Sequence, residues 1–179
     1  GIQRETSKAV WEGDKLVIAT LHETLSPDTG KPMTVEVRRT LEAVRSPDQA
    51  LEAHQARLAV KRLRYLLESL GTRFRGGPHA VSRLASVQDA LGMLHDRHLL
   101  LERVHHDALE VPAPPPGRPT RRAYTSLHAA VHRSVVSEFG RAVRLCRGRG
   151  TAAALRTVER IASALTGEPV PTPLADASL

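Results

Sequence analysis

Basic side chains recur along one face of a predicted helix near the middle of the chain. Residues 54–68 read HQARLAVKRLRYLLE, in which the residues that we call the basic row lie three, four and three positions apart: His54, Arg57, Lys61 and Arg64. At about 100° per residue they share one side of a helix, and the apolar residues share the opposite side. Like charges at such spacings repel each other. The helix therefore needs acidic side chains of the same protein or an anionic ligand to offset this repulsion.

The simplest structural interpretation of the basic row is the solvated face of an amphipathic helix. Two features favour a ligand instead. The face is almost purely basic, with Tyr65 beside it and Glu68 one turn beyond Arg64. It also contains more Arg than Lys, and the planar guanidinium group of Arg suits paired hydrogen bonds to phosphate or carboxylate.

The composition indicates a basic protein with one domain and few aromatic residues. Of the 179 residues, 41% are hydrophobic but only 3% are aromatic, which favours helices packed through Ala, Leu and Val. The formal net charge of +7 predicts attraction to polyanions, with nucleic acid, anionic membrane surfaces and polyphosphate as the open classes. Cys146 is the single cysteine, so an internal disulfide is excluded and a reducing, cytoplasmic compartment is expected. No run of transmembrane length and no signal peptide is predicted.

Helical periodicity extends over most of the sequence, without strand-like alternation of useful length. The predicted fold class is all-α, built from antiparallel helical hairpins in a four-helix-bundle-like arrangement. Leu63, Leu67, Leu91 and Val131 are expected to share one core. The predicted helices cover residues 2–25, 33–44, 47–70, 81–109, 121–145 and 151–165.

The domain organisation follows from these elements. One helical domain is expected over residues 1–166, with its motif core at 47–110. The proline-rich stretch 112–117 predicts a stiff, extended connection between helices, and the tail 167–179 is predicted to be disordered.

Two carboxylates on the helix 81–109 are candidates to balance the basic row. Asp89 and Asp96 lie seven residues apart and share a flank of this helix. They could form an acid–base pair or a metal site, but the favoured interpretation is that they pair with arginines of the helix that carries the basic row. Gly92, in the middle of the same helix, predicts a close backbone crossing.

A second basic surface is predicted on the helix 121–145. Arginines recur there every eleven residues, almost three helical turns, and another lies nearby: Arg122, Arg133 and Arg144, with Arg141. On this argument the four arginines join the candidate anion-binding residues.

Catalytic and metal-binding signatures are absent from the sequence. Nine histidines raise the question of a metal site, and His128 and His132 lie four residues apart, but no HExxH pair, cysteine partner or EF-hand loop accompanies them. Cys146 has arginine neighbours that could lower the pKa of its thiol, yet no catalytic signature surrounds it. We therefore predict a binding module with no catalytic residues, no cofactor and no metal ligands.

Two motifs carry a resemblance to a known family. The first, HxxRxxxKRxRY from His54 to Tyr65, matches the pattern HxxRxxx[KR]RxR in full. The second, VQDxLGxLxD from Val87 to Asp96, is similar to the pattern LQDxLGxxxD. Together, in this order and at this separation, they resemble the CHAD family, the conserved histidine α-helical domain. The clear match spans residues 54–104, and the later helices agree only in pattern.

The resemblance implies a fold, a ligand and a set of binding residues. Members of the family are expected to have two similar four-helix halves related by a pseudo-twofold axis, with basic residues around a central cavity. The implied function is non-catalytic binding of inorganic polyphosphate, often together with a triphosphate-tunnel (CYTH) domain or polyphosphate granules. The anion-binding residues that the first motif implies are His54, Arg57, Lys61, Arg62 and Arg64.

This sequence departs from the family by carrying one strong copy of the basic motif. Arg38 and Arg39 are the only remnant of a second copy before residue 45. Either one half of the domain is missing or degenerate, or two chains pair as a homodimer to rebuild the cavity.

Polyphosphate binding along the basic helix faces is the leading hypothesis. Polyphosphate has no bases to stack, and this chain has few aromatic residues of the kind that single-strand-binding proteins use. Sequence-independent nucleic-acid binding by the same faces is the alternative, and a metal-stabilised helical scaffold is a third hypothesis. Protonation of His54 near an anion predicts stronger binding as the pH falls from 8 to 6.

Overall fold

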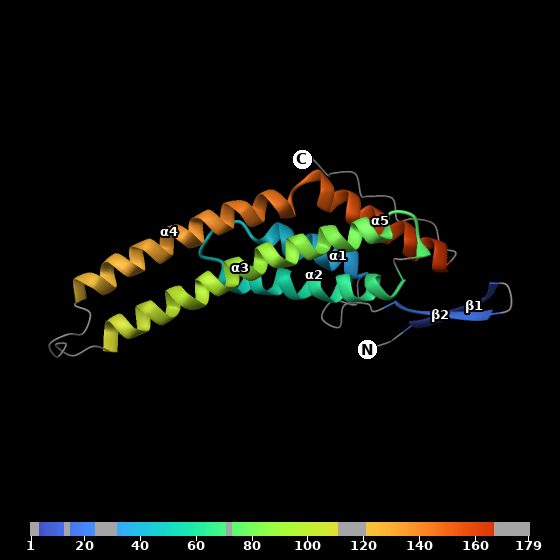
Figure 1. Ribbon diagram of the computed structural model, residues 1–179, viewed down its shortest axis with the longest axis horizontal. Coiled ribbons are helices and arrows are strands. Elements are labelled where there is room, and N and C mark those ends of the chain that lie inside the picture. Colours follow the sequence, from blue (N-terminus) through green and yellow to red (C-terminus); the bar gives the residue numbers. More distant parts are fainter. Residues whose placement is uncertain (1–3, 13–14, 24–31, 71–72, 111–120, 167–179) are drawn as a thin grey trace, which may run out of the picture.

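Five helices and a β-hairpin make up the described parts of the chain in the computed structural model (Figure 1). The structure describes residues 4–12, 15–23, 32–70, 73–110 and 121–166. The predicted proline-rich linker and the predicted disordered tail lie outside the described residues. In chain order the elements are β1 (Arg4–Glu12), β2 (Lys15–Glu23), α1 (Met33–Ala43), α2 (Ala50–Leu70), α3 (Gly77–Glu110), α4 (Arg121–Cys146) and α5 (Arg149–Thr166).

The long helix α3 is the centre of the arrangement. It packs against α2, α4 and α5, and α1 packs against α2. The C-terminal part of α3 continues with α4 beside it, and these two helices extend past the other described elements (Figure 1). We call this extension the α3–α4 arm. The helical fold class is confirmed, and α2 with α3 forms one of the predicted antiparallel hairpins.

The helix predicted over residues 2–25 is wrong, because this segment forms the β1–β2 hairpin. The strands pair antiparallel, from Arg4 opposite Glu23 to Glu12 opposite Lys15. Two sequence signals favoured a hairpin over a helix. Val, Ile, Thr and Trp are concentrated here, and these residue types prefer strands. The sequence also places Gly13 and Asp14 between the strands, a dipeptide that favours two-residue hairpin turns.

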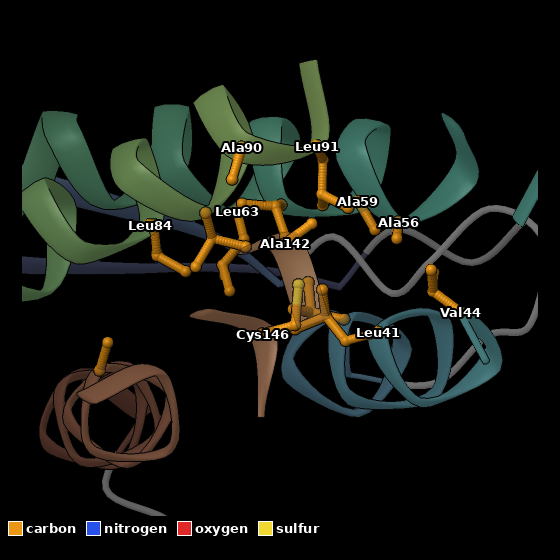
Figure 2. Packing of buried hydrophobic residues seen from close by; sticks show 14 of the residues in the cluster. Leu41, Val44, Ala56, Ala59, Leu63, Leu84, Ala90, Leu91, Ala142 and Cys146 are labelled. Carbon is orange, nitrogen blue, oxygen red and sulfur yellow. The ribbon is translucent and has the colours of Figure 1, made fainter. Parts of the chain in front are cut away.

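The hydrophobic core is aliphatic and lies between all five helices. Leu63, Leu67 and Leu91 belong to it as predicted, but Val131 is buried separately, on the α3–α4 arm. Alanines such as Ala56 fill many of the contact positions and allow the helices to approach closely. Figure 2 shows the core side chains of α2 and α3 converging on those of α1 and α4: Leu41, Val44, Ala56, Ala59, Leu63, Leu84, Ala90, Leu91, Ala142 and Cys146.

The start of α2 differs from its prediction by several residues. The helix begins at Ala50, not at Pro47, and Ser46 is not its N-cap. The side chain of Gln49 organises the preceding turn, because its Oε1 accepts hydrogen bonds from the backbone N–H groups of Arg45 (2.7 Å) and Ser46 (2.8 Å). A buried contact fixes the same turn to α3, where Nε2 of His98 lies 2.6 Å from the carbonyl oxygen of Pro47. This contact sets where α2 starts along α3.

A buried hydroxyl group joins the α4–α5 junction to α3. Thr151 is 1% exposed, and its Oγ1 donates a hydrogen bond to the carbonyl oxygen of Leu145 (2.6 Å). Oγ1 of Thr151 also accepts a hydrogen bond from Nε of Arg83 on α3 (3.3 Å). Gly148 and Gly150 leave room for the Arg83 side chain, because a Cβ at either position would lie within 3.1 Å of a guanidinium nitrogen.

Candidate anion-binding surface

The basic row lies along the edge of α2 that faces α3. His54, Arg57, Lys61 and Arg64 are all half-buried, and the side chain of Arg64 is only 18% exposed. Arg62, which the family motif also implies, is exposed and lies about 100° further around α2 than Lys61. The structure therefore brings four of the five motif residues together and sets Arg62 apart.

Three contacts between α2 and α3 follow one another along the row. The rings of His54 and His95 lie 4.7 Å apart between their centroids. One turn further along α2, Nε of Arg57 lies 3.5 Å from the position that a Cβ would take at Gly92. Two turns later, Nε of Arg64 donates a hydrogen bond to Oε1 of Gln88 (3.0 Å). The partners descend along α3 as the row ascends α2, as antiparallel helices require.

Gly92 makes room for a side chain and not for a crossing backbone. The nearest atom to its hypothetical Cβ is the guanidinium nitrogen of Arg57. The predicted close backbone crossing is therefore wrong. The 3.5 Å separation is an ordinary van der Waals contact, and it places the Arg57 side chain beside α3 at this position.

Asp89 and Asp96 do not pair with the basic row, which corrects the prediction that one of them would. Both are exposed, and neither forms an ion pair with another described residue. Each stands one position after a residue that faces α2, namely Gln88 and His95, and one position turns a side chain about 100° around the helix. The α3 side chain that forms a hydrogen bond with the row is the neutral Gln88, so this contact balances no charge.

Much of the positive charge of the row lacks a partner. Arg64 forms an ion pair with Glu68 one turn later, and no other member of the row has an ion pair within the described parts of the chain. Tyr65 lies beside two of the cations, with its ring centroid 4.5 Å from Cζ of Arg64 and 5.6 Å from Nζ of Lys61. Nδ1 of His54 and Nε of Arg57 are buried without a hydrogen-bond partner. Buried polar atoms of this kind are costly to leave unsatisfied.

The electrostatic surroundings of His95 reflect this excess of positive charge. Burial lowers the pKa of the His95 imidazole, and the neighbouring His54 and Arg57 lower it further. The Asp96 carboxylate acts in the opposite direction but does not cancel these effects. The free protein therefore keeps His95 neutral over a wider pH range than an ordinary histidine.

The four arginines predicted on α4 form a surface separate from the basic row. Arg122, Arg133, Arg141 and Arg144 are exposed, whereas Val131, Val135, Ala142 and Cys146 are the buried residues of the same helix. Arg141 lies 3.9 Å from Glu138, and no described contact connects any of the four with the row on α2. The two predicted basic surfaces are thus on different helices, with α3 packed against both.

Three functional positions were missed by the sequence reasoning or misread by it: Gln88, Gly92 and His95. Their spacing of four and three residues is that of one helix face, and it mirrors the spacing of the basic row. Aligning the two rows antiparallel would have placed His95 opposite His54 and Gln88 near Arg64. The argument from charge balance indicated acidic partners and not this pattern.

Neither a metal centre nor a membrane span is found in the described parts of the chain. No group of three or more His, Cys, Asp or Glu side chains among the described residues is arranged to hold a metal ion. None of the described helices combines the length and the apolar character needed to cross a bilayer. The thiol of Cys146 is buried, and its burial raises its pKa to about 11, against the lowering that its arginine neighbours suggested.

The basic row lies within a segment of the chain that matches a known family. A family model described as the CHAD domain matches residues 16–105, which is half of the chain. The match covers β2, α1, α2 and most of α3, and so it contains the whole basic row and its partners on α3. A search of curated proteins and a search of solved structures found no match to this chain.

Proposed function

Because this chain belongs to the CHAD domain family, some members of which bind polyphosphate, we propose that it is a non-catalytic module that binds inorganic polyphosphate through the basic row of α2. The expected setting is cytoplasmic, with polyphosphate or polyphosphate granules as the partner. The observation that carries this proposal is the row of half-buried cations beside α3, in which only Arg64 has an ion pair to a described residue.

The geometry of the row fits a flexible chain of phosphates. His54, Arg57, Lys61 and Arg64 extend over three turns of α2, so they follow a line and do not converge on one point. A linear polyanion can place successive phosphates along such a line, and each arginine can donate to two oxygens. Arg64 is held by its hydrogen bond to Gln88 of α3, which reduces the conformational entropy lost on binding.

The groups around the row suit binding more than turnover. They are mainly cations, with the amide of Gln88 and the ring of Tyr65, and the one carboxylate in contact with the row, Glu68, is held in an ion pair with Arg64. Asp89 and Asp96, the nearby acids that could act as a base, are turned away from α2. Binding without turnover is therefore the proposed activity.

Nucleic-acid binding is the alternative, favoured by the net charge of +7. Competition separates the two ligands. We expect long-chain polyphosphate to displace a labelled DNA oligonucleotide from the protein at an equal concentration of phosphate groups. Displacement of polyphosphate by DNA under the same conditions would favour the alternative and contradict the proposal.

A further inference from the structure

We propose that His95 of α3 is a further anion-contacting residue, and that with His54 it forms a proton-linked pair that binds one phosphoryl group of the polyanion. The inference rests on the proposed function, because it assigns a residue and a regulation to the same surface. It predicts that protons are taken up when the anion binds.

The geometry brings three nitrogen-bearing side chains together from two helices. The rings of His54 and His95 are tilted by 45° at a centroid separation of 4.7 Å. Arg57 lies one turn along α2, beside Gly92 of α3, and its charge acts on the His95 ring. Nδ1 of His54 and Nε of Arg57 have no hydrogen-bond partner, while all three residues remain partly exposed. The two buried nitrogens lie out of reach of a ligand, so a phosphate oxygen would bind at the parts of these side chains that remain exposed.

The charges around His95 determine the direction of the proton linkage. His54 and Arg57 face it from α2, and Asp96 and His98 lie near it on α3. His98 is held at the turn before α2 by its contact with the carbonyl oxygen of Pro47. The positive neighbours outweigh Asp96 and, with burial, keep the His95 pKa low in the free protein. A bound phosphoryl group reverses the sign of the local potential, so it raises the pKa and favours the protonated ring.

Proton uptake makes the affinity depend on pH. In the unbound protein His95 is neutral above its lowered pKa, and in the complex it is held protonated, so binding tightens as the pH falls through this range. For one such histidine the expected gain is roughly threefold to tenfold between pH 8.0 and pH 5.5. The internal phosphates of a long polyphosphate stay ionised over this range, so the ligand itself does not produce the change.

The α3–α4 arm offers a matched control pair. His105 and His128 face each other across α3 and α4 with ring centroids 5.9 Å apart. They lie beyond His98, outside the basic row. The same substitution at His105 therefore removes a histidine from a similar inter-helix pair without touching the proposed cluster.

The experiment measures the affinity for long-chain inorganic polyphosphate at pH 8.0 and pH 5.5 for the wild type, His95→Gln and His105→Gln. Between pH 8.0 and pH 5.5 we expect the affinity of the wild type and of His105→Gln to rise by the same factor. For His95→Gln we expect the logarithm of the affinity to rise by no more than about half of the wild-type increase, because His54 alone remains. Far-ultraviolet circular dichroism and thermal unfolding confirm that each variant is folded.

Two results would overturn the inference while leaving the proposed function intact. One is an equal pH dependence of His95→Gln and the wild type. The other is a loss of affinity in His95→Gln that is the same at both pH values, which would mark a structural role only. Histidine titration by NMR gives a direct check, since the His95 pKa should rise by about one unit or more on saturation with polyphosphate. Absence of polyphosphate binding by the wild type at both pH values would refute the proposed function itself.

Discussion

The hydroxyl group of Thr151 should contribute measurably to stability, and Thr151→Val tests this. Valine has nearly the same shape as threonine, so the substitution removes the polar group without opening a cavity. It deletes the hydrogen bond to the carbonyl oxygen of Leu145 and takes away the acceptor of Arg83 Nε. Because Thr151 is 1% exposed, water cannot replace these partners.

The magnitude follows from the groups that remain. An intramolecular hydrogen bond contributes about 0.5–1.5 kcal/mol, and a buried group left without a partner costs more. The Leu145 carbonyl keeps a second, longer hydrogen bond from the backbone N–H of Gly148 (3.3 Å), which limits the loss. We therefore expect the free energy of unfolding to fall by about 1–2 kcal/mol, and the midpoint of thermal unfolding to fall by about 2–8 °C.

Urea denaturation followed by circular dichroism at 222 nm measures the effect. Thr157→Val is the matched control, because Thr157 lies on the same helix and its exposed hydroxyl makes hydrogen bonds only within that helix: it donates to the Ala153 carbonyl and accepts from the Arg160 guanidinium. We expect this control to stay within about 0.5 kcal/mol of the wild type. Equal stability losses in the two variants would show that the buried hydroxyl does not hold the α4–α5 junction to α3.

Three further predictions concern single residues. The Cys146 pKa of about 11 leaves about one thiolate per thousand at pH 8, so a thiol reagent should react on the order of 100-fold more slowly with the native protein than with the urea-unfolded chain. Gly148→Ala should destabilise the protein by about 1–3 kcal/mol in urea titrations, because the new Cβ would lie 2.9 Å from the Arg144 carbonyl oxygen. The lowered pKa of His95 makes the unfolded chain bind more protons, so its stabilising contribution is present above about pH 6.5 and lost as the pH falls through the folded pKa. In ligand-free urea titrations at pH 7.5 and pH 5, His95→Gln should therefore lose less stability than the wild type on acidification.

The helical elements after residue 32 were predictable because their apolar residues repeat at helical spacing. Leu63, Leu67 and Leu91 could be assigned to one core on this ground alone. Helix ends were less accurate. Ser46 and Pro47 have the residue types of a helix start, but the side chain of Gln49 and the contact of His98 with Pro47 delay α2 to Ala50. Such tertiary contacts leave no local signal in the sequence.

The β1–β2 hairpin was misread because helical spacing of a few valines and leucines also arises by chance in a short strand pair. Val10 and Val17 fitted a helix face, yet they lie opposite each other in the hairpin register. Preference for strand-forming residue types, together with Gly13-Asp14, was the better guide. The seven-residue spacing of Val10 and Val17 is weaker evidence than the turn-forming residues between the strands.

The basic row itself was predictable, whereas its partners on α3 required the packing of two helices. Opposite charge suggested Asp89 and Asp96, but the rotation of α3 turns Gln88 and His95 toward α2 instead. A one-residue difference along a helix moves a side chain by about 100°, which a charge argument alone does not resolve.

The salt dependence of polyphosphate binding tests the central claim most directly. Each phosphate contact releases counterions, so the slope of log affinity against log salt reports the number of contacts, at roughly 0.7–0.9 per contact in nucleic acids. Arg57→Ala with Arg64→Ala removes two members of the row. Arg133→Ala with Arg144→Ala removes the same charge from the exposed face of α4.

We expect the α2 double variant to lose about tenfold or more in affinity at 0.1 M salt and to flatten the slope by about 1.5. Its free energy of unfolding should fall by only about 1–2 kcal/mol, mainly because the hydrogen bond between Arg64 and Gln88 is lost. The charge-matched α4 variant should retain most of the wild-type affinity and slope. A folded α2 double variant with wild-type affinity and slope, or an equal loss in both double variants, would contradict the assignment of polyphosphate binding to the basic row.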